Sequence, residues 1–472
     1  MTSTPYPAPR HPYAALGYAP IVMAEETSQF QRLGFNVLLV FLFLTISRIF
    51  DVKFGNFHIT GIAFRVMLAM VLLSRCFMLA LQTKIGKALM GFTVMMAFSV
   101  PFSVWRTGSK EVFQGWAMLA FVAFLGITGL VANYQQWQKV HKTLLLGLLV
   151  FAMIANVFGV SNGGRLILEQ GKFANPNEMA QVLLLGLPMW GAVMATSESP
   201  FRKILAGGVM VLMLATTFRT GSRGAMIGFT VMMAVVFLRA SVANKMKLAF
   251  AGLLFAGVVV TIMPGNLVAR YKTVTDADDT DMDAAMADSA VSSTQSRREL
   301  LKHSLIFTMQ HPLFGVGPGM FAVADDAYAH TLGKRKGTWL GTHNSYTQVS
   351  SEVGIPALLF YLSAVYFALT GPLQIYRKTQ GDPRLEKMGI YALGLHYTMI
   401  IYAVTVLFEH IAYSLMLPTF AGCVAGLMRV ADAEIERVKA VPLAPSMSTD
   451  MFRTYLAQRP RQRQMGQPVQ PL

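Results

Sequence analysis

The residues best placed for chemistry lie in the segment 341–356, where a long polar stretch meets an apolar one. Ser345 and Gln348 have the spacing of a capping box, in which each side chain satisfies a free backbone N–H at the start of a helix. The spacing therefore predicts a helix that begins near Ser345. His343 and Asn344 then lie just ahead of the helix, outside the apolar run, where they are able to face a ligand.

Arginines are expected at the same membrane face as His343. Two flank the turn at Ser222 and two open an amphipathic stretch; they are Arg219, Arg223, Arg297 and Arg298. Cations near helix N-termini, which are themselves partly positive, form anion sites, and the planar guanidinium suits a phosphate. Taken singly, an interfacial arginine often reaches lipid headgroups instead, and a histidine often serves as a cap or loop residue. Their coincidence at one face favours an anion site.

Histidine has an unperturbed pKa of about 6.5, so His343 can accept a proton from a hydroxyl while arginines hold a negatively charged leaving group. This combination predicts transfer of a group from a diphosphate to an alcohol. No Ser-His-Asp set, metal cluster or pair of carboxylates is evident in the sequence, which disfavours hydrolases and metalloenzymes. No bound metal or cofactor is expected.

The composition indicates a polytopic membrane protein. Hydrophobic residues make up 54% and charged residues 14% of the chain, against about 25% charged in soluble proteins. The net charge of +16 is spread through short connections, so it favours membrane lipids and anionic ligands as partners and not nucleic acid. Cys76 and Cys423 lie inside apolar runs, so neither a disulfide framework nor a CxxC metal site is expected.

Apolar runs long enough to cross the membrane, at roughly 20 residues each, recur along the chain. They lie at 33–50, 59–82, 86–104, 112–131, 143–160, 179–196, 203–218, 222–240, 246–264, 346–370, 388–408 and 411–430. The sequence therefore predicts an all-α, polytopic membrane helix bundle of about 12 transmembrane helices.

The positions of Lys and Arg predict how the chain is oriented. With the N-terminus in the cytoplasm, the inner connections hold thirteen Lys and Arg residues and the short outer connections seven, as the positive-inside rule expects. The predicted division is a cytoplasmic Pro-rich tail at 1–32, a membrane domain at 33–430 and a cytoplasmic disordered tail at 431–472. The segment at about 265–345 becomes an outer loop that contains short helices.

The outer loop changes character along its length. Its Asp-rich part, 276–288, has no apolar period and no EF-hand pattern, so a mobile acidic loop is predicted. From residue 296 the pattern predicts a short amphipathic helix with Leu301, Leu305 and Ile306 on one face, ending at 311–312.

A glycine-rich stretch follows this helix. Gly315, Gly317 and Gly319 resemble a phosphate loop, but no strand is predicted before them and Pro318 removes a donor. A tight turn against the membrane surface is the better interpretation.

Four stretches, read in order, resemble the O-antigen ligase and polymerase superfamily over roughly residues 170–360. They are 173–180 (FANPNEMA), 220–225 (TGSRGA), Arg297 followed by 311–321 (HPLFGVGPGMF), and 342–346 (THNSY) through 352–355 (EVGI). Two features depart from the family pattern. Leu301 stands where an aromatic residue is common, and Arg298 adjoins Arg297, so either arginine could hold a phosphate. The Asp-rich segment 276–288 is a further departure.

The resemblance implies a twelve-span glycosyltransferase of the bacterial inner membrane whose active site faces the periplasm, which makes the outer loop periplasmic. The implied donor is a glycan on undecaprenyl diphosphate. The implied acceptor is lipid A-core, another glycan repeat or a protein hydroxyl. By motif, Arg223 and Arg297 would engage the diphosphate, and His343 would act as the base.

Residues and resemblance together predict a metal-independent glycosyltransferase of lipopolysaccharide biosynthesis, of the O-antigen ligase type with lipid A-core as acceptor. Asn344 and Tyr346 would orient the histidine or the sugar. The alternative is a polysaccharide repeat-unit polymerase or a protein O-oligosaccharyltransferase. A glycan or lipid transporter would place charges near the middle of several spans, but here the charges gather at the outer face, apart from Arg65 and Arg75. A structural scaffold would tolerate replacement of His343.

Overall fold

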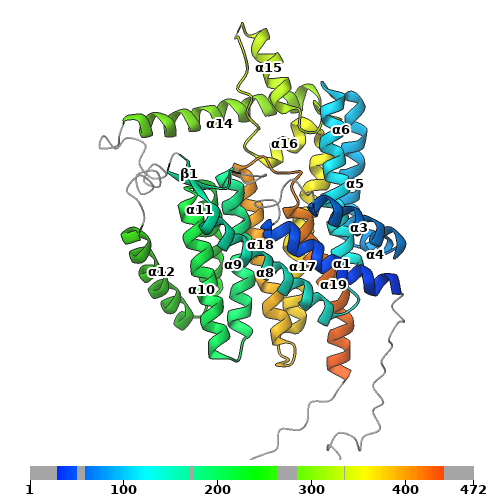
Figure 1. Ribbon diagram of the computed structural model, residues 1–472, viewed down its shortest axis with the longest axis vertical. Coiled ribbons are helices and arrows are strands. Elements are labelled where there is room, and N and C mark those ends of the chain that lie inside the picture. The colour runs from blue at the N-terminus through cyan, green and yellow to red at the C-terminus, as the bar shows by residue number, and fades with distance from the viewer. Residues whose placement is uncertain are drawn as a thin grey trace, which may run out of the picture.

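The computed structural model describes residues 29–49, 59–162, 164–169, 175–262, 284–333 and 335–440. Long helices form a bundle, and a smaller group lies across its upper end in Figure 1, which we call the head. The head contains α14 (Ala284–Gln310), α15 (Phe321–Thr331) and α16 (Ser345–Glu352). In these described ranges the strands are only β1 (Val160–Asn162) and β2 (Arg165–Ile167), which pair antiparallel. The fold is all-α, as predicted.

The bundle is built from α-helices with short 3₁₀ or π turns between some of them. Its helices are α1 (Gln29–Ser47), α3 (Ile59–Leu73), α4 (Phe77–Gln82), α5 (Lys84–Ser99), α6 (Arg106–Gly115), α7 (Val122–Leu130), α8 (Tyr134–Phe158), α9 (Pro176–Thr196), α10 (Pro200–Arg219), α11 (Arg223–Arg239), α12 (Val242–Ile262), α17 (Ile355–Thr379), α18 (Glu386–Thr405) and α19 (Met416–Ala440). The short turns are η3 (Val100–Phe102), η4 (Trp116–Phe121) and η6 (Val406–Phe408).

Several of these helices match the predicted membrane spans. Among the described residues, 8 segments are long and apolar enough to cross a membrane: Gln29–Ser47, Lys84–Phe102, Arg106–Leu130, Tyr134–Phe158, Pro176–Thr196, Pro200–Arg219, Ile355–Thr379 and Glu386–Phe408. The other predicted runs also contain helices, namely α3 with α4, α11, α12 and α19. The polytopic helix bundle is therefore confirmed, while the count of twelve spans stays a prediction.

The predicted tails are mostly outside the described residues. The structure reaches into them at two points, because α1 begins at Gln29 and α19 continues to Ala440, beyond the predicted end of the membrane domain at residue 430.

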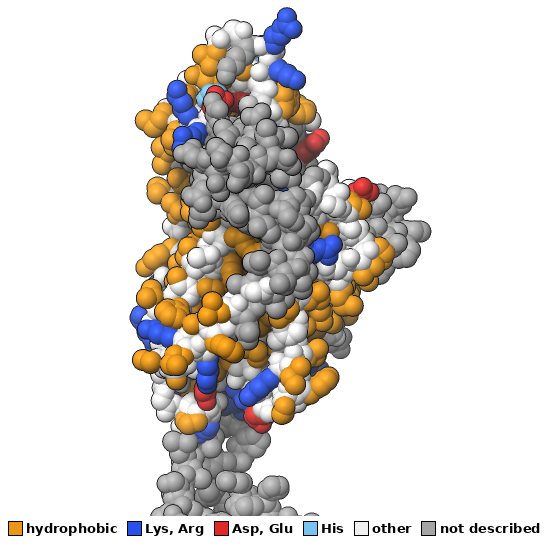
Figure 2. All heavy atoms as spheres, turned by 90° about the vertical axis from the view of Figure 1, so that its left-hand side faces the viewer, with side chains coloured by type: hydrophobic (Ala, Val, Ile, Leu, Met, Phe, Trp, Pro, Cys, Tyr) orange, Lys and Arg blue, Asp and Glu red, His pale blue; other side chains and the backbone are white. Residues whose placement is uncertain are grey.

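Hydrophobic side chains cover much of the outer surface of the bundle. In the face shown in Figure 2 they spread over its middle, while Lys and Arg appear chiefly toward its lower end and on the head. Phe201, Ile204 and Leu238 are 73%, 75% and 74% exposed. Soluble proteins rarely expose large contiguous apolar areas, whereas helices in lipid must present them. This surface is that of a multi-pass membrane protein.

Polar groups inside the bundle are joined in pairs. The Gln181 amide on α9 donates from Nε2 to Thr405 Oγ1 on α18 at 2.6 Å, and the Tyr361 and Tyr402 hydroxyls lie 2.7 Å apart. Such links between helices satisfy groups that lipid cannot. The two cysteines are buried and form no disulfide.

The predicted run 346–370 is not one helix, which corrects the position of this span. α16 is followed by Gly354, which has a φ of 99°, and α17 begins only at Ile355. A Cβ on Gly354 would lie 2.3 Å from the Leu313 carbonyl oxygen. Only glycine permits this approach of two backbones. The membrane-crossing helix is therefore 355–379.

The predicted start of α16 near Ser345 is confirmed, but the predicted capping box is wrong. The cap is Asn344, whose Oδ1 accepts hydrogen bonds from the backbone N–H groups of Tyr346 at 2.9 Å and Thr347 at 3.1 Å. An asparagine at this position satisfies the first free donors of a helix. Ser345 and Gln348 are therefore left for long-range contacts.

The head begins earlier in the chain than the sequence pattern indicates. Because α14 starts at Ala284, the predicted mobile acidic loop is wrong for 284–288, and its first part, 276–283, lies outside the described residues. α14 ends at Gln310, close to the predicted end. His303 Nδ1 on α14 lies 2.6 Å from Asp325 Oδ1, which joins α14 to α15.

The face of α14 that packs in the head is only partly the predicted one, because Ile306 packs against the core of the head while Leu301 and Leu305 are exposed. Leu300 and Phe307 are buried, whereas Leu301 and Leu305 are 40% and 50% exposed. Phe307 packs against Phe321 of α15 with ring centroids 5.6 Å apart. The buried face of α14 is therefore centred one residue away from the face that carries Leu301 and Leu305. These two side chains form a second apolar face, which is exposed.

The glycine-rich stretch is a tight turn, as interpreted from the sequence. Gly315, Gly317 and Gly319 have φ values of 64°, 107° and 76°, which glycine alone adopts readily. Backbone N–H groups of Gly319 and Phe321 donate to the two carboxyl oxygens of Glu352, at 2.8 and 3.2 Å. The turn thus holds an internal carboxyl group, so these donors are already used and a phosphate-loop role is excluded for them.

Glu352 makes the stability of this junction depend on pH. Burial raises the pKa of Glu352 to about 7, although hydrogen bonds from the turn oppose the shift. Because the folded pKa lies above the unfolded value, this stability is fully present below about pH 4.5 and is lost as pH rises through 7. We expect the native chain to lose on the order of 3 kcal/mol between pH 5 and 8 through this group.

Thermal unfolding in detergent at the two pH values checks this prediction. Glu352→Gln should have a shallower pH dependence than the native chain, because its amide does not titrate. Glu299→Gln, at an exposed position on α14, is the matched control and should behave as the native chain does. Equal pH dependence in all three proteins would contradict the role given to Glu352.

Candidate active site

His343 lies where the head meets the bundle, beside His410. The two rings meet edge to face, with centroids 5.1 Å apart and planes at 87°. His343 has a φ of 51°, a left-handed conformation that is uncommon for residues other than glycine. A Cβ on Gly341 would lie 2.5 Å from the His410 ring, so the chain entering His343 passes directly against that ring. Close packing therefore fixes the imidazole of His343.

The residues of the expected capping box dock the connection between α18 and α19 instead. The Ser345 hydroxyl donates to the Glu409 carbonyl oxygen at 2.8 Å and accepts from the Ile411 N–H at 3.0 Å. Gln348 Oε1 accepts from the Ala412 N–H at 3.1 Å. These bonds attach the short connection to the first turn of α16. They fix the backbone on both sides of His410 next to the helix that follows His343.

Glu409 is a buried carboxyl group next to this histidine pair. Its side chain is 2% exposed, and neither carboxyl oxygen has a hydrogen-bond partner within the described part of the chain. Burial raises its pKa well above the ordinary value, the charge of Glu178 raises it further, and Arg297 and Arg165 lower it. The site therefore contains two interacting carboxyl groups and two guanidinium groups around the connection that carries His410.

Arg165 is held at this site by two other elements. On β2, its Nε donates to the Thr220 carbonyl oxygen and its Nη2 to Asn177 Oδ1, both at 2.7 Å. The hairpin thus connects the C-terminus of α10 to the N-terminus of α9, which also carries Glu178. Arg165 is thus half-buried and hydrogen-bonded within the fold.

The turn between α10 and α11 separates its two arginines. Ser222 caps α11 by accepting from the Ala225 N–H at 3.3 Å, which places half-buried Arg223 in the first turn. A Cβ on Gly224 would lie 2.7 Å from Phe408 Cβ, so this turn packs beside the residue that precedes Glu409. Arg219 is exposed and donates to Asn156 Oδ1 on α8 at 2.6 Å. This bond turns Arg219 toward α8.

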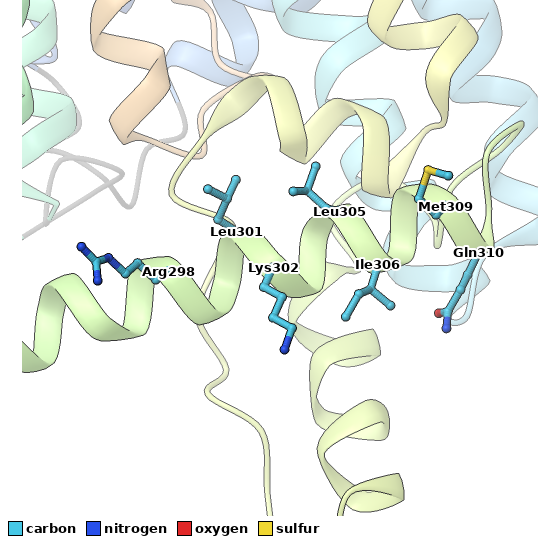
Figure 3. A pocket seen from close by; sticks show the side chains of 7 residues that line it. All are labelled: Arg298, Leu301, Lys302, Leu305, Ile306, Met309 and Gln310. Atoms are coloured by element: carbon cyan, nitrogen blue, oxygen red, sulfur yellow. The ribbon is translucent and has the colours of Figure 1, made fainter.

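The structure also distinguishes the adjacent arginines of α14. Arg297 is half-buried, and its positive charge lowers the pKa of both His343 and Glu409. Arg298 is exposed and lines an open apolar groove along α14 with Lys302 (Figure 3). The charge of Arg297 therefore acts on the histidine, whereas the Arg298 side chain is exposed.

The protonation of His343 follows from its surroundings. Burial lowers its pKa to about 4, with smaller effects from the charges of His410 and Arg297. Burial also lowers the pKa of His410. Both imidazoles are therefore neutral near pH 7 and able to accept a proton. An anion bound beside Arg297 would raise the proton affinity of His343, because opposite charges stabilise one another.

Asn344 and Tyr346 have structural tasks here. Asn344 caps the N-terminus of α16 and directly follows His343, which has the left-handed conformation. The Tyr346 hydroxyl donates to the Ala403 carbonyl oxygen at 2.9 Å, and its ring lies edge to face with Tyr361. Tyr346 is therefore turned into the bundle.

Four residues of this site were missed in the sequence: Arg165, Glu178, Glu409 and His410. The sequence could have indicated Glu409 and His410, because these two polar residues make up the whole connection between two predicted spans. The charge of Glu178 acts on Glu409, an interaction between carboxyl groups that the sequence did not indicate. In the described ranges no group of three or more His, Cys, Asp and Glu side chains is arranged to hold a metal.

The fold and this site define a multi-pass, all-α membrane protein with a histidine and several arginines at one end of its bundle. Residues 208–362 match the family model of the O-antigen ligases, which confirms the resemblance to the O-antigen ligase and polymerase superfamily. The match supports a function of the ligase or polymerase type in general. No curated protein matches the chain. The matched segment includes His343, Arg223 and Arg297, whereas Arg165 and Glu409 lie outside it.

Proposed function

We propose that the chain is a glycosyltransferase that moves a glycan from undecaprenyl diphosphate to a hydroxyl of lipid A-core. It would act in the bacterial inner membrane with its site facing the periplasm. The observation that carries the proposal is the imidazole of His343, which packs edge to face with His410, is neutral near pH 7 and is acted on by the charge of Arg297. His343 and Arg297 both lie in the segment that matches the O-antigen ligases. A neutral base and a fixed cation suit an acceptor hydroxyl and an anionic leaving group.

The proposed reaction is a direct displacement at the anomeric carbon. The acceptor oxygen forms the new bond to that carbon, the bond from carbon to diphosphate oxygen breaks, and the configuration inverts. The hydroxyl proton passes to His343, and the electron pair leaves with undecaprenyl diphosphate. Arg297, Arg223 and Arg165 stabilise the negative charge, and one such donor typically contributes about 3 kcal/mol to the transition state. The scheme uses no metal or cofactor.

Transfer in detergent tests this function. Purified chain is mixed with the glycan on undecaprenyl diphosphate and lipid A-core, with EDTA present, and the products are separated by mass. Glycosylated lipid A-core is the expected product, and protein-free micelles are the control. Lengthened lipid-linked glycan would indicate a polymerase instead, and glycan on a protein hydroxyl would indicate an O-oligosaccharyltransferase. Movement of unaltered donor across a vesicle membrane, with no covalent product, would indicate a transporter.

A further inference from the structure

A cavity of about 340 Å³ lies next to the site, between α1, α6, α9 and the connection to α19. Its size is at the lower end of ligand pockets, which span about 300–1,000 Å³. Polar and aromatic side chains line it; they are Arg48, Glu111, Trp116, Glu178, Gln181 and Tyr413. The mechanism above uses none of them, so these residues need a separate explanation.

Gln181 provides the clearest sign of a missing ligand. The residue is fully buried and lines the cavity, and its Nε2 donates to Thr405 Oγ1. Its Oε1 has no hydrogen-bond partner among the described residues. A buried acceptor without a donor is unfavourable, because it has lost water and gained nothing in return. A ligand with a hydroxyl group in the cavity would supply the donor.

The lining carries two carboxyl groups and one guanidinium, that of Arg48, and this net negative charge favours a neutral sugar over a phosphate. Glu111 and Glu178 place two carboxyl groups on this cavity, while Arg297 and Arg165 act on Glu409 at the neighbouring site. Carboxylates accept hydrogen bonds from hydroxyls but repel an anion. Aliphatic side chains of the lining, among them Val112, Leu119 and Ile411, would cover the apolar face of a ring. Hydroxyls at the edges and an apolar face are the features of a pyranose.

We propose that this cavity binds one sugar residue of the glycan substrates, next to the bond that is formed. The inference rests on the proposed function for the source of the sugar. Ile411, directly after His410, lines the cavity, and the charge of Glu178 acts on Glu409, so a bound ring adjoins the histidine pair. The sugar belongs either to the donor, next to the diphosphate, or to the acceptor, next to the attacking hydroxyl.

Kinetics of two variants test the proposal and identify the source. Gln181→Leu removes the buried acceptor, and Glu111→Gln removes a carboxylate from an exposed position where folding is not at risk. Each should raise KM for one substrate roughly tenfold, the effect of one lost hydrogen bond, with little change in kcat. A raised KM for the donor assigns the cavity to the donor sugar, and a raised KM for lipid A-core assigns it to the acceptor.

The matched controls are Gln114→Leu on α6 and Glu198→Gln near the opposite end of α9. Both side chains are exposed and lie outside the cavity lining. Their KM values should equal those of the native chain. KM values for both substrates within twofold of native in the two cavity variants would overturn the proposal.

A binding measurement separates this inference from the proposed function. His343→Ala protein is heated with core oligosaccharide released from lipopolysaccharide, or with repeat-unit oligosaccharide released from its lipid. One of them should raise the unfolding temperature, and Glu111→Gln or Gln181→Leu in the same background should abolish the rise. If the native chain transfers no glycan, the proposed function is refuted. The binding result still shows whether the cavity holds a sugar. No rise with either sugar, or an equal rise in all variants, would overturn the sugar site.

Discussion

Arg297→Ala is expected to lower the rate of glycan transfer by about 10²–10³-fold, the usual effect of removing one donor to a developing negative charge. Arg298→Ala should stay within about threefold of the native rate, because Arg298 faces the open groove of α14. The pair is a matched comparison, since both residues are arginines on one helix and differ mainly in what they face. Initial rates of transfer at saturating donor and acceptor, measured for the native chain and both variants, check this prediction.

A third substitution separates charge from shape at this position. Arg297→Lys keeps the positive charge but loses the planar fork that binds two phosphate oxygens at once. We expect a rate between those of the native chain and Arg297→Ala. A larger loss in Arg298→Ala than in Arg297→Ala would contradict the placement of Arg297 beside His343. Comparable unfolding temperatures in all three variants would exclude a folding defect.

The helices of the bundle were predictable because their signal is local. A run of about 20 apolar residues must satisfy its backbone within itself in lipid, so each predicted span contains a helix. The break at Gly354 was not predictable from the run 346–370. It depends on the close approach of the Leu313 carbonyl oxygen, a contact between segments that are distant in the sequence.

The capping box shows how a tertiary contact overrides a local pattern. Ser345 and Gln348 have the right spacing, but both bind the connection 409–412 in the folded chain. Asn344, one residue earlier, is an equally good cap. A local rule identified where the helix begins, while the choice between neighbouring caps depended on a segment some sixty residues away.

Contacts that are distant in the sequence also decided which face of α14 is buried and which residues meet in the site. Periodicity showed that α14 is amphipathic, but it could not tell the face covered by α15 from the face left exposed at Leu301 and Leu305. In the site, His343 and the arginines were visible as polar residues at one membrane face. Glu409 and Arg165 became relevant only through folding, which brings β2 and the α18–α19 connection to the same place.

His343→Asn is expected to reduce transfer by about 10²–10⁴-fold, the usual contribution of a general base. Asparagine is the informative replacement because it tolerates the left-handed conformation that His343 adopts at φ 51°. Its amide does not accept a proton from the acceptor hydroxyl. His343→Ala should lose as much activity and also strain the backbone. The measurement is single-turnover transfer to lipid A-core, with donor binding measured separately.

The pH dependence of the native enzyme provides an independent check on this assignment. With a pKa of about 4 in the free protein, His343 remains neutral well below the ordinary histidine range, so kcat/KM should fall only as pH approaches 4. His410→Gln should move this acid limb upward, because the charge of His410 contributes to lowering the pKa of His343. Transfer by His343→Asn within a few fold of native, or an acid limb unaffected by His410→Gln, would remove His343 from the role of base. The role of base would then pass to His410, whose neutral imidazole packs against that of His343, or to the buried carboxyl group of Glu409.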